Sequence, residues 1–367
     1  MTWTPLAGIR VLDLSGMLPG PFASQVLADL GATVIKVERP GAGDAMRSLQ
    51  PHMYETVNAG KHSIALDLRD PDDHAVLRGL ASDADILLDG FRPGVLDRLG
   101  AGFDDIAALN PRIIYVSMSG WGLDGPLAAD PGHNGTFTAR AGAVHLTGSG
   151  ESPVEIPVPY ADLAAALYAV IGVVATLRDP DREAVHLDVS LFASALAFML
   201  PRIAEYVGAG ATSAADIMER PANGVFACRD GAVVIAAVED HFWESLCTAL
   251  GLDDFRGRAG WDTYPGRSAA ATEINSRIAA AVADRDRDDV VAHLRAQGIP
   301  VSPVLAPDEV HADEQVRHLG YLQPDRPLRS ILPIRGVDLA AVDTVEELDA
   351  SGAAIRAAGW AGVGQPL

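Results

Sequence analysis

The stretch from Gly8 to Pro40, GIRVLDLSGMLPGPFASQVLADLGATVIKVERP, decides the fold of the first half of the chain. Residues 8–16 are typical of a buried strand that ends in a glycine-rich turn. The next segment predicts a helix, with Pro21 in its first turn and Gly31 at its end. A second strand then follows over residues 32–40. Because a strand–helix–strand unit belongs to a parallel sheet, we expect a Rossmann-like domain.

The same alternation continues along the chain and predicts a large α/β domain over residues 1–200. Further strands are expected at 63–68, 85–91, 112–120 and 185–191, with helices near 72–81, 95–99 and 194–210.

The pattern changes near residues 218–223 and indicates a smaller α+β domain over 220–318. Residues 319–367 are rich in Pro, Leu and Gly, and we expect them to pack back on the large domain. The small domain is predicted to contain a hairpin over 223–239 that turns at 229–231, and helices at 240–252, 269–283 and 288–297.

The overall charge of −21 over 367 residues argues against nucleic acid or an anionic membrane as the partner. Basic groups that hold an anionic ligand must therefore be local exceptions. The chain has only two lysines, Lys36 and Lys61, so arginine supplies nearly all of its positive charge. Arginine is also the better fork for phosphate.

The two cysteines, Cys228 and Cys247, form no metal-binding motif. A disulfide scaffold and a metal site are therefore not expected, and a cytoplasmic location fits. The N-terminus lacks the basic and apolar regions of a signal peptide. The most apolar segment, Leu163–Leu177, is shorter than the roughly 20 residues that span a bilayer, so we interpret it as a core helix.

A dinucleotide ligand is not favoured. The first turn has Gly16 and Gly20 but no G-x-G-x-x-G pattern. Glu38 stands where a ribose-binding acid would lie, although a solvated residue at a strand end is the more common interpretation.

Several arginines favour a ligand with phosphate groups instead. They follow strands, at the sheet edge where ligands of open α/β folds bind. For any single arginine, an ion pair with a nearby carboxylate is an equally good interpretation. The arginines of this edge are Arg39, Arg69, Arg92 and Arg98.

Five segments in order resemble the class III coenzyme A transferase (CaiB/BaiF) family: "GIRVLDLS", "LADLGATVIKVERPG", "GKHSIALDL", "FRPGVLDRLG" and "NPRIIYVSMSGWG". The resemblance implies a Rossmann-like large domain, a small domain, and an interlocked homodimer. It implies no cofactor beyond the CoA of the substrate. It also implies contacts to this acyl-CoA by Arg39, Leu66, Asp67, Leu68, Arg69, Asp89, Gly90, Phe91, Arg92, Arg98, Gly132, Asn134, Gly135, Thr136 and Phe137.

Three residues match catalytic positions of this family: Asp162, His133 and Glu239. In transferases the aspartate is a nucleophile that forms an acyl anhydride and then a CoA thioester. In the racemase subgroup, a histidine and the aspartate exchange a proton with the α-carbon. "GHNGTF" around His133 and the glutamate at Glu239 resemble the racemases. A helix N-cap is the alternative interpretation of Asp162.

We therefore expect an acyl-CoA racemase or epimerase that inverts a 2-substituted acyl group through an enolate. His133 and Asp162 are expected to act as the two bases. Glu239 is expected to orient His133, and backbone N–H groups at the start of the Asp162 helix to stabilise the enolate oxygen. A CoA transferase that uses Asp162 is the main alternative, and a non-catalytic CoA-binding relative is the third.

One departure from the racemase pattern concerns the acyl pocket. Racemases follow the aspartate with several glycines, whereas Asp162 is followed by "LAAAL". The bulkier Leu163 is expected to narrow or reshape this pocket, so the 2-methyl branched substrate is a weaker inference than the reaction.

Overall fold

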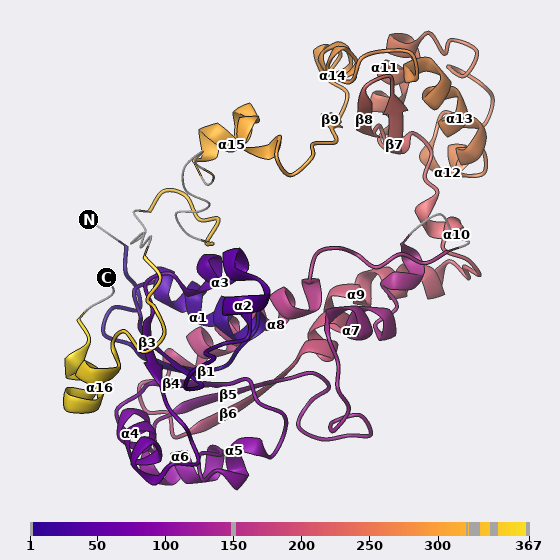
Figure 1. Cartoon of the computed structure of the whole chain (residues 1–367). Coiled ribbons are helices and arrows are strands. Elements are labelled where there is room, and N and C mark those ends of the chain that lie inside the picture. The colour runs from indigo at the N-terminus through magenta and orange to yellow at the C-terminus, as the bar shows by residue number, and fades with distance from the viewer. Residues whose placement is uncertain (1–2, 148–151, 321, 323–330, 338–343, 365–367) are drawn as a thin grey trace. The chain divides into compact units, whose positions relative to one another are not determined.

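Six parallel strands form the sheet that the repeated strand–helix pattern predicts (Figure 1). Their order is β3-β2-β1-β4-β5-β6, and every neighbouring pair is parallel. This is the doubly wound order, in which the chain reverses its direction across the sheet between β1 and β4. The strands are β1 (Arg10–Leu14), β2 (Thr33–Glu38), β3 (His62–Ala65), β4 (Ile86–Asp89), β5 (Ile114–Ser119) and β6 (Val185–Ser190).

The computed structural model describes residues 3–147, 152–320, 322, 331–337 and 344–364. The chain divides into two units. The first contains Met1–Val144, Val154–Pro201 and Gln315–Leu367, and the second contains His145–Pro153 and Arg202–Glu314. The fold class expected from the sequence is confirmed by the parallel sheet of the first unit and the separate antiparallel sheet of the second. The predicted domain boundaries stay a prediction.

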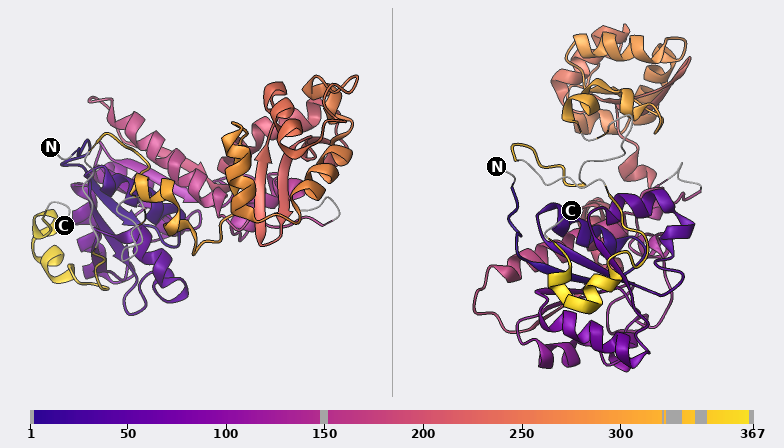
Figure 2. Two further views of the ribbon diagram at one scale, coloured as in Figure 1. Left: turned by 90° about the horizontal axis from the view of Figure 1, so that it is seen from above. Right: turned by 60° about the vertical axis from the view of Figure 1, so that its left-hand side comes forward.

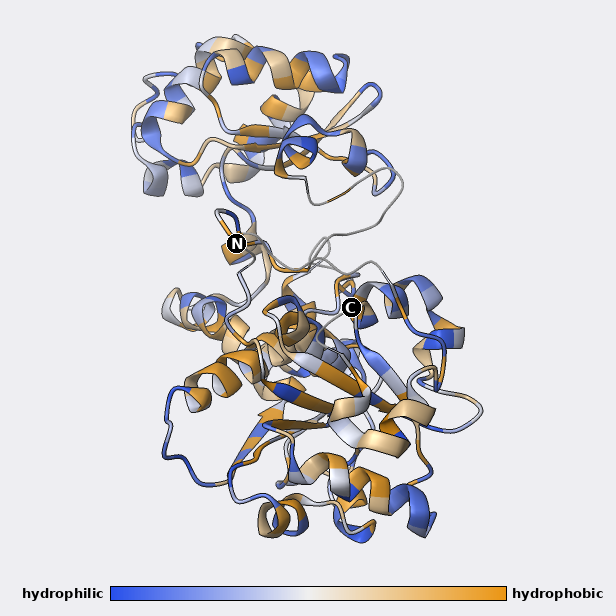
Figure 3. Ribbon diagram, turned by 90° about the vertical axis from the view of Figure 1, so that its left-hand side faces the viewer, coloured by the Kyte–Doolittle hydropathy of each residue, from blue (hydrophilic) through white to orange (hydrophobic). Residues whose placement is uncertain are grey.

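Helices cover both faces of the parallel sheet, because alternate strand residues point to opposite faces. In β1, Val11 belongs to the core on one face and Leu12 to the core on the other. Hydrophobic residues accordingly make up much of the strands of this sheet (Figure 3). The first core is closed by α1 (Pro19–Asp29), α7 (Asn134–Arg140), α8 (Tyr160–Leu177) and α9 (Leu191–Gly208). The second is closed by α4 (Pro71–Ser82), α5 (Val95–Arg98), α6 (Phe103–Leu109) and α16 (Gly352–Ala358).

Near the C-terminus, α16 and the short helix that follows it pack on the large unit (Figure 2). Ile355 of α16 is buried in the second core, and so is Trp360 in the short helix η3 (Gly359–Gly362). The indole N–H of Trp360 donates to the carbonyl oxygen of Leu80 at 2.9 Å. The other short elements of the chain are α2 (Met46–Leu49), α3 (Pro51–Asn58), η1 (Val144–Leu146), η2 (Val310–Ala312) and α15 (Glu314–Leu319).

In the second unit, an antiparallel sheet in the order β7-β8-β9 packs one face against helices. The predicted hairpin is present as β7 (Asn223–Cys228) and β8 (Gly231–Ala236). The sequence analysis missed β9 (Val301–Pro303), a three-residue edge strand that ends in proline and therefore carries little periodic signal. The helices are α10 (Ala215–Met218), α11 (Asp240–Leu250), α12 (Tyr264–Ser268), α13 (Ala271–Val282) and α14 (Arg287–Ala296).

Helix α8 is a core helix on one face only. Its alanine-rich face is buried, whereas Leu167, Tyr168, Ile171 and Val174 are exposed. Phe198 and Leu200 of α9 are also exposed. Both helices are long and apolar enough to cross a membrane by length and composition alone, which is weak evidence for a membrane span.

Candidate active site

A cavity of about 800 Å³ lies at the carboxyl ends of β1, β4 and β5. Its wall includes the turn after β1 from Ser15 to Gly20 and the turn after β4 from Gly90 to Pro93. These turns flank the point at which the strand order reverses. Ligands of open α/β sheets bind at this point, because the loops on either side of it diverge and leave a crevice.

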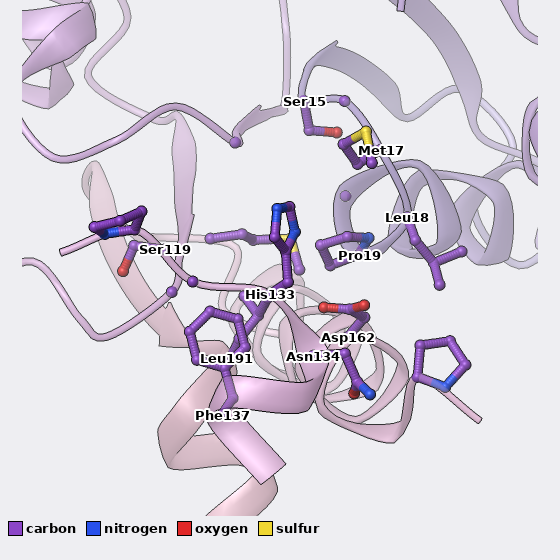
Figure 4. Close-up of a pocket in the computed structure, with 18 of the residues that line it drawn as sticks. Ser15, Met17, Leu18, Pro19, Ser119, His133, Asn134, Phe137, Asp162 and Leu191 are labelled. Atoms are coloured by element: carbon purple, nitrogen blue, oxygen red, sulfur yellow. The ribbon is translucent and has the colours of Figure 1, made fainter. Parts of the chain in front are cut away.

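Asp162 and His133 both point into this cavity (Figure 4). They are far apart in the sequence and belong to different helices. One hydrogen bond joins the beginnings of these helices, since Asn134 Oδ1 accepts the backbone N–H of Ala161 at 3.1 Å. Each partner of this bond is the immediate neighbour of one of the two residues. The bond therefore fixes where the imidazole and the carboxylate lie along the cavity wall.

Asp162 is the third residue of α8, whose N-cap is Pro159. The alternative interpretation of Asp162 as an N-cap is therefore wrong. Within the described residues its side chain accepts no hydrogen bond and forms no ion pair. Burial alone raises the pKa of Asp162 from its ordinary 3.8 to about 6, because nothing in the surroundings compensates the charged form.

The start of α8 offers one free donor to the cavity. The N–H of Tyr160 donates to the carbonyl of Val158 at 2.8 Å, and that of Ala161 is taken by Asn134. In the part of the chain that the structure describes, the N–H of Asp162 has no partner. The expected group of free N–H donors at this helix start is thus reduced to one.

His133 occupies the N-cap position of α7 with extended backbone. Its backbone N–H donates to Thr136 Oγ1 at 3.0 Å, and this hydroxyl donates to the carbonyl oxygen of His133 at 2.7 Å. The loop residue is therefore fixed by its backbone, and its exposed imidazole is free to meet a ligand in the cavity.

Glu239 belongs to the second unit, where it is the N-cap residue of α11. The buried side chain of Arg267 holds both neighbours of Glu239. It donates to the carbonyl of Val238 at 3.0 Å and to Asp240 Oδ1 at 2.8 Å. The turn that carries Glu239 is thus fixed within its own unit. The hydrogen bond from Glu239 to His133 stays a prediction.

Two further cavities are lined by residues that the family resemblance assigns to CoA binding. One of about 480 Å³ is lined by Arg39, Leu66–Arg69 and Phe91. A smaller one of about 280 Å³ shares Arg39 and Phe91 with it. The smaller cavity also shares Ser15, Gly16, Met17, Gly90 and Phe91 with the 800 Å³ cavity. The three cavities adjoin one another along the sheet edge, and we refer to them together as the channel.

The remaining assigned residues divide into two groups. Gly132, Asn134, Phe137 and Arg92 line the 800 Å³ cavity. Asp89 instead lies behind the channel, and its carboxylate accepts the N–H of Phe91 at 2.8 Å and the hydroxyl of Tyr115 at 3.1 Å. As far as the structure describes the chain, the residues that line none of the three cavities are Asp89, Arg98, Gly135 and Thr136.

The four arginines that the sequence predicts at this sheet edge are available for an anion, although Arg98 lines none of the three cavities. Across residues 3–147 and the other described ranges, the side chains of Arg39, Arg69, Arg92 and Arg98 form no ion pair with a carboxylate. The interpretation that carboxylates neutralise them is therefore wrong. In a chain of net charge −21, a row of uncompensated guanidinium groups is a local exception that favours phosphate.

Glu38 is not a solvated residue at a strand end, because only 4% of it is exposed. Its carboxylate accepts two hydrogen bonds from Arg47, both at 2.8 Å, and the N–H of Asp44 at 2.9 Å. Burial opposes ionisation, but these donors hold the pKa of Glu38 below its ordinary value. Glu38 therefore stabilises the loop after β2 and is not free to bind a ribose.

The sequence analysis missed two features of the cavity. It did not predict the methionines that line it, nor the buried lysines that donate hydrogen bonds behind it. Met17, Met46, Met53 and Met118 line the cavity, although no periodic signal links them. Both lysines are buried, and Lys61 donates to the carbonyl of Pro21 at 2.8 Å. A chain of 367 residues with only two lysines is unusual, and this scarcity is the sequence signal that could have drawn attention to Lys36 and Lys61.

The doubly wound α/β unit has an imidazole and a carboxylate at one end of a channel suited to phosphate groups. These features indicate an α/β protein that binds a phosphorylated ligand. The family follows from the sequence profile of CoA-transferase family III, which matches residues 6–337. The chain belongs to this family and is an enzyme that acts on CoA thioesters.

Named relatives of the chain are CoA transferases. An acetyl-CoA:oxalate CoA-transferase from Acetobacter aceti is 30% identical over 96% of this chain and 95% of its own length. A succinyl-CoA:glutarate CoA-transferase from Mus musculus is 32% identical over 87% of this chain and 76% of its own. A crystal structure of a CAIB/BAIF family protein from Brucella suis matches with a TM-score of 0.86 and 30% identity, covering 97% and 99%. The predicted family is confirmed, whereas none of these names is a racemase.

Proposed function

We propose that this enzyme transfers CoA between carboxylic acids and that Asp162 is its nucleophile. The observation that carries this proposal is a carboxylate without hydrogen-bond partners among the described residues, placed at the end of the channel. Burial makes this carboxylate more basic than an exposed one, yet with a pKa of about 6 it is still mostly ionised at neutral pH. The transferase names of the relatives support the same reaction.

The first half of the reaction converts the acyl-CoA into an enzyme-bound thioester. A carboxylate oxygen of Asp162 attacks the thioester carbonyl, so that a C–O bond forms, the C–S bond breaks and CoA leaves as a thiolate. This thiolate attacks the Asp162 carbonyl of the mixed anhydride. The donor acid leaves as a carboxylate, and Asp162 carries CoA as a thioester. The acceptor carboxylate then runs the same steps in reverse.

Each attack places negative charge on a carbonyl oxygen, and two groups of the cavity are suited to stabilise it. The free N–H of Asp162 is one donor, and His133 supplies a second from the facing helix start. Removal of a single such donor in an enzyme typically costs about 3–4 kcal/mol of transition-state stabilisation.

CoA itself fits the channel by its chemistry. Its phosphorylated adenosine end needs cations, which Arg39 and Arg69 supply at the 480 Å³ cavity. Its long neutral arm follows the small connecting cavity toward Asp162. We propose no cofactor beyond this CoA.

Covalent trapping tests the proposal. The enzyme is incubated with an acyl-CoA and then with hydroxylamine, and the peptides are analysed by mass spectrometry. We expect a hydroxamate at Asp162, and none in an Asp162→Asn variant. An Asp130→Asn variant is the matched control, because Asp130 lies on the same cavity but is exposed. Absence of a covalent adduct, with or without acyl exchange into a free acid, would refute a nucleophilic Asp162.

A racemase is the second candidate, and one observation favours it. The imidazole of His133 lines the same cavity as the carboxyl group of Asp162, whose pKa is raised by burial. Incubation with a 2-methylacyl-CoA in deuterated water then incorporates deuterium at the α-carbon with loss of stereochemical purity. His133→Ala would slow exchange of one enantiomer far more than the other. Acyl transfer without α-deuteration excludes this candidate.

We also propose a homodimer in the cytoplasm. The support for a dimer is the exposed apolar face formed by Leu167, Ile171, Phe198 and Leu200 on α8 and α9, which water does not favour on an isolated chain. Sedimentation of the purified enzyme measures this directly.

A further inference from the structure

The buried part of the wall beside Asp162 is apolar. The buried side chains of this wall, apart from two serines, are Leu18, Met46, Met118, Phe137 and Leu191. Four of the seven methionines in the chain line the cavity. Methionine is unbranched and polarisable, so such a wall accommodates apolar groups of varied shape.

The polar groups of the buried wall already have partners. The hydroxyl of Ser15 donates to Asp13, and Ser119 Oγ accepts the N–H of Gly122 at 3.0 Å. The charges on the cavity are mostly negative, because Asp130 and Glu155 line it together with Asp162.

Among the described residues that line the cavity, Arg92 is the one arginine, and no lysine lines it. Arg92 is exposed and follows the Gly90–Phe91 turn, which also lines the connecting part of the channel. Its side chain lines this cavity and neither of the two others. Among the described residues, the apolar wall contains no cation that would receive a second carboxylate.

One carboxylate holds two of the methionines in place. Asp44 Oδ1 accepts the N–H of Met17 at 3.2 Å and that of Met46 at 3.0 Å. Its other oxygen pairs with Lys36 at 3.0 Å, and Lys36 also donates to the carbonyl of Ser15 at 3.0 Å. Met17 has a φ of 62°, a left-handed conformation that is costly for a residue with a side chain. The Lys36–Asp44 pair maintains it.

Leu163 packs behind this wall and contacts the residues that form it. It does not line the cavity itself, so of the two expected effects, narrowing and reshaping, only reshaping through its neighbours agrees with its position. It packs instead against the cluster of Leu18, Met46, Tyr54 and Val57, two of which face the cavity. The residue that replaces the glycine of the racemases thus supports the apolar wall.

We propose, building on the transferase function, that the acyl group carried by this enzyme is apolar and has no second carboxylate. A saturated aliphatic acyl chain fits, whereas the dicarboxylic acids in the names of the relatives do not. A distal carboxylate would lose its hydration against methionine and leucine, in a cavity where the three carboxylates of Asp130, Glu155 and Asp162 outnumber the guanidinium group of Arg92. Lys36, Asp44 and Met17 are positioning residues for this preference.

Binding measurements test the acyl group independently of catalysis. Dissociation constants of hexanoyl-CoA, glutaryl-CoA and free CoA are measured by calorimetry on the full enzyme. We expect hexanoyl-CoA to bind roughly ten-fold or more tightly than glutaryl-CoA. Equal affinities, or a preference for glutaryl-CoA, overturn the proposal. Tight binding of hexanoyl-CoA without a hydroxamate at Asp162 refutes the transferase function but leaves the apolar acyl site intact.

A gain of function sharpens the test. Gln50 is exposed on the cavity between α2 and α3, where an arginine has room. Gln50→Arg is expected to tighten glutaryl-CoA binding while leaving hexanoyl-CoA binding nearly unchanged. Gln297→Arg, the same change at an exposed helix end in the second unit, is the matched control and should alter neither. If Gln50→Arg gives no gain for glutaryl-CoA, the acyl group does not lie against this wall.

Discussion

Replacement of Asp162 by asparagine should make the protein more stable at the same time as it abolishes transfer. Folding moves this carboxyl group from water into the cavity, and burial alone raises its pKa from 3.8 to about 6. Between these pH values the folded chain binds more protons than the unfolded chain, so stability falls as the pH rises. Above about pH 6 the whole penalty is present, and two pH units correspond to about 3 kcal/mol.

The pH dependence separates this charge effect from other consequences of the substitution. The linkage relation gives a penalty of about 1.6 kcal/mol at pH 5 and about 3 kcal/mol at pH 8 for these two pKa values. An asparagine carries no charge, but its buried amide costs about the same at both pH values. The stability advantage of the variant at pH 8 should therefore exceed that at pH 5 by about 1.4 kcal/mol.

Urea unfolding of the wild type and the variant at the two pH values measures this difference. Asp130→Asn is the control, since this exposed residue on the same cavity should change stability by no more than about 0.5 kcal/mol at either pH. An advantage of Asp162→Asn that is equal at pH 5 and pH 8, or a loss of stability at both, would show that the carboxylate is not desolvated as described.

Four further predictions concern the channel, the chemistry and the assembly. Formation of the Asp162 thioester in a single turnover should rise about tenfold from pH 5 to pH 7 with a midpoint near 6, and a midpoint near 4 would contradict the raised pKa. Arg39→Ala should raise KM for acyl-CoA with a smaller effect on kcat, as lost ground-state binding does, whereas Arg295→Ala, an exposed arginine outside the channel, should leave both unchanged. Ile171→Glu on the exposed face of α8 should shift the sedimentation coefficient from that of a dimer toward that of a monomer, and an unchanged value argues against this face as the interface. Lys36→Met leaves its carboxylate partner buried and unpaired and should lower the free energy of unfolding by about 3–5 kcal/mol in urea titrations, so a neutral effect would contradict the buried ion pair.

Local pattern was sufficient to predict the frame of this protein. The run from Gly8 to Pro40 contains two apolar strands around an amphipathic helix, with proline and glycine at the helix ends. This order allows only a parallel, right-handed unit, and its repetition builds the sheet. His133 and Asp162 were predicted as site residues from the resemblance to the family, since the residues around Asp162 fit the start of an ordinary helix equally well.

Packing between distant segments decided what surrounds these residues. The bond from Asn134 to Ala161 joins the two helix starts, and Asp44 links Met17 to Met46. Neither hydrogen-bonded link leaves a periodic pattern in the sequence, because each link depends on how the helices pack against the sheet once the strands have paired. The same reason explains Leu163, which packs against residues more than 100 positions earlier in the chain, whereas Glu38 is held by Asp44 and Arg47 of the loop and helix that follow it.

The sequence by itself determined the parallel sheet and the sheet edge at which a ligand is expected. Through the family resemblance it also indicated His133 and Asp162 as candidate reactive side chains. The tertiary structure alone decided that Asp162 stands without a hydrogen-bond partner in an apolar wall, among the residues described. The periodic patterns of strands and helices depend on residues that are close in the sequence. The desolvation of a carboxylate depends on all the atoms that pack around it, wherever they lie in the sequence.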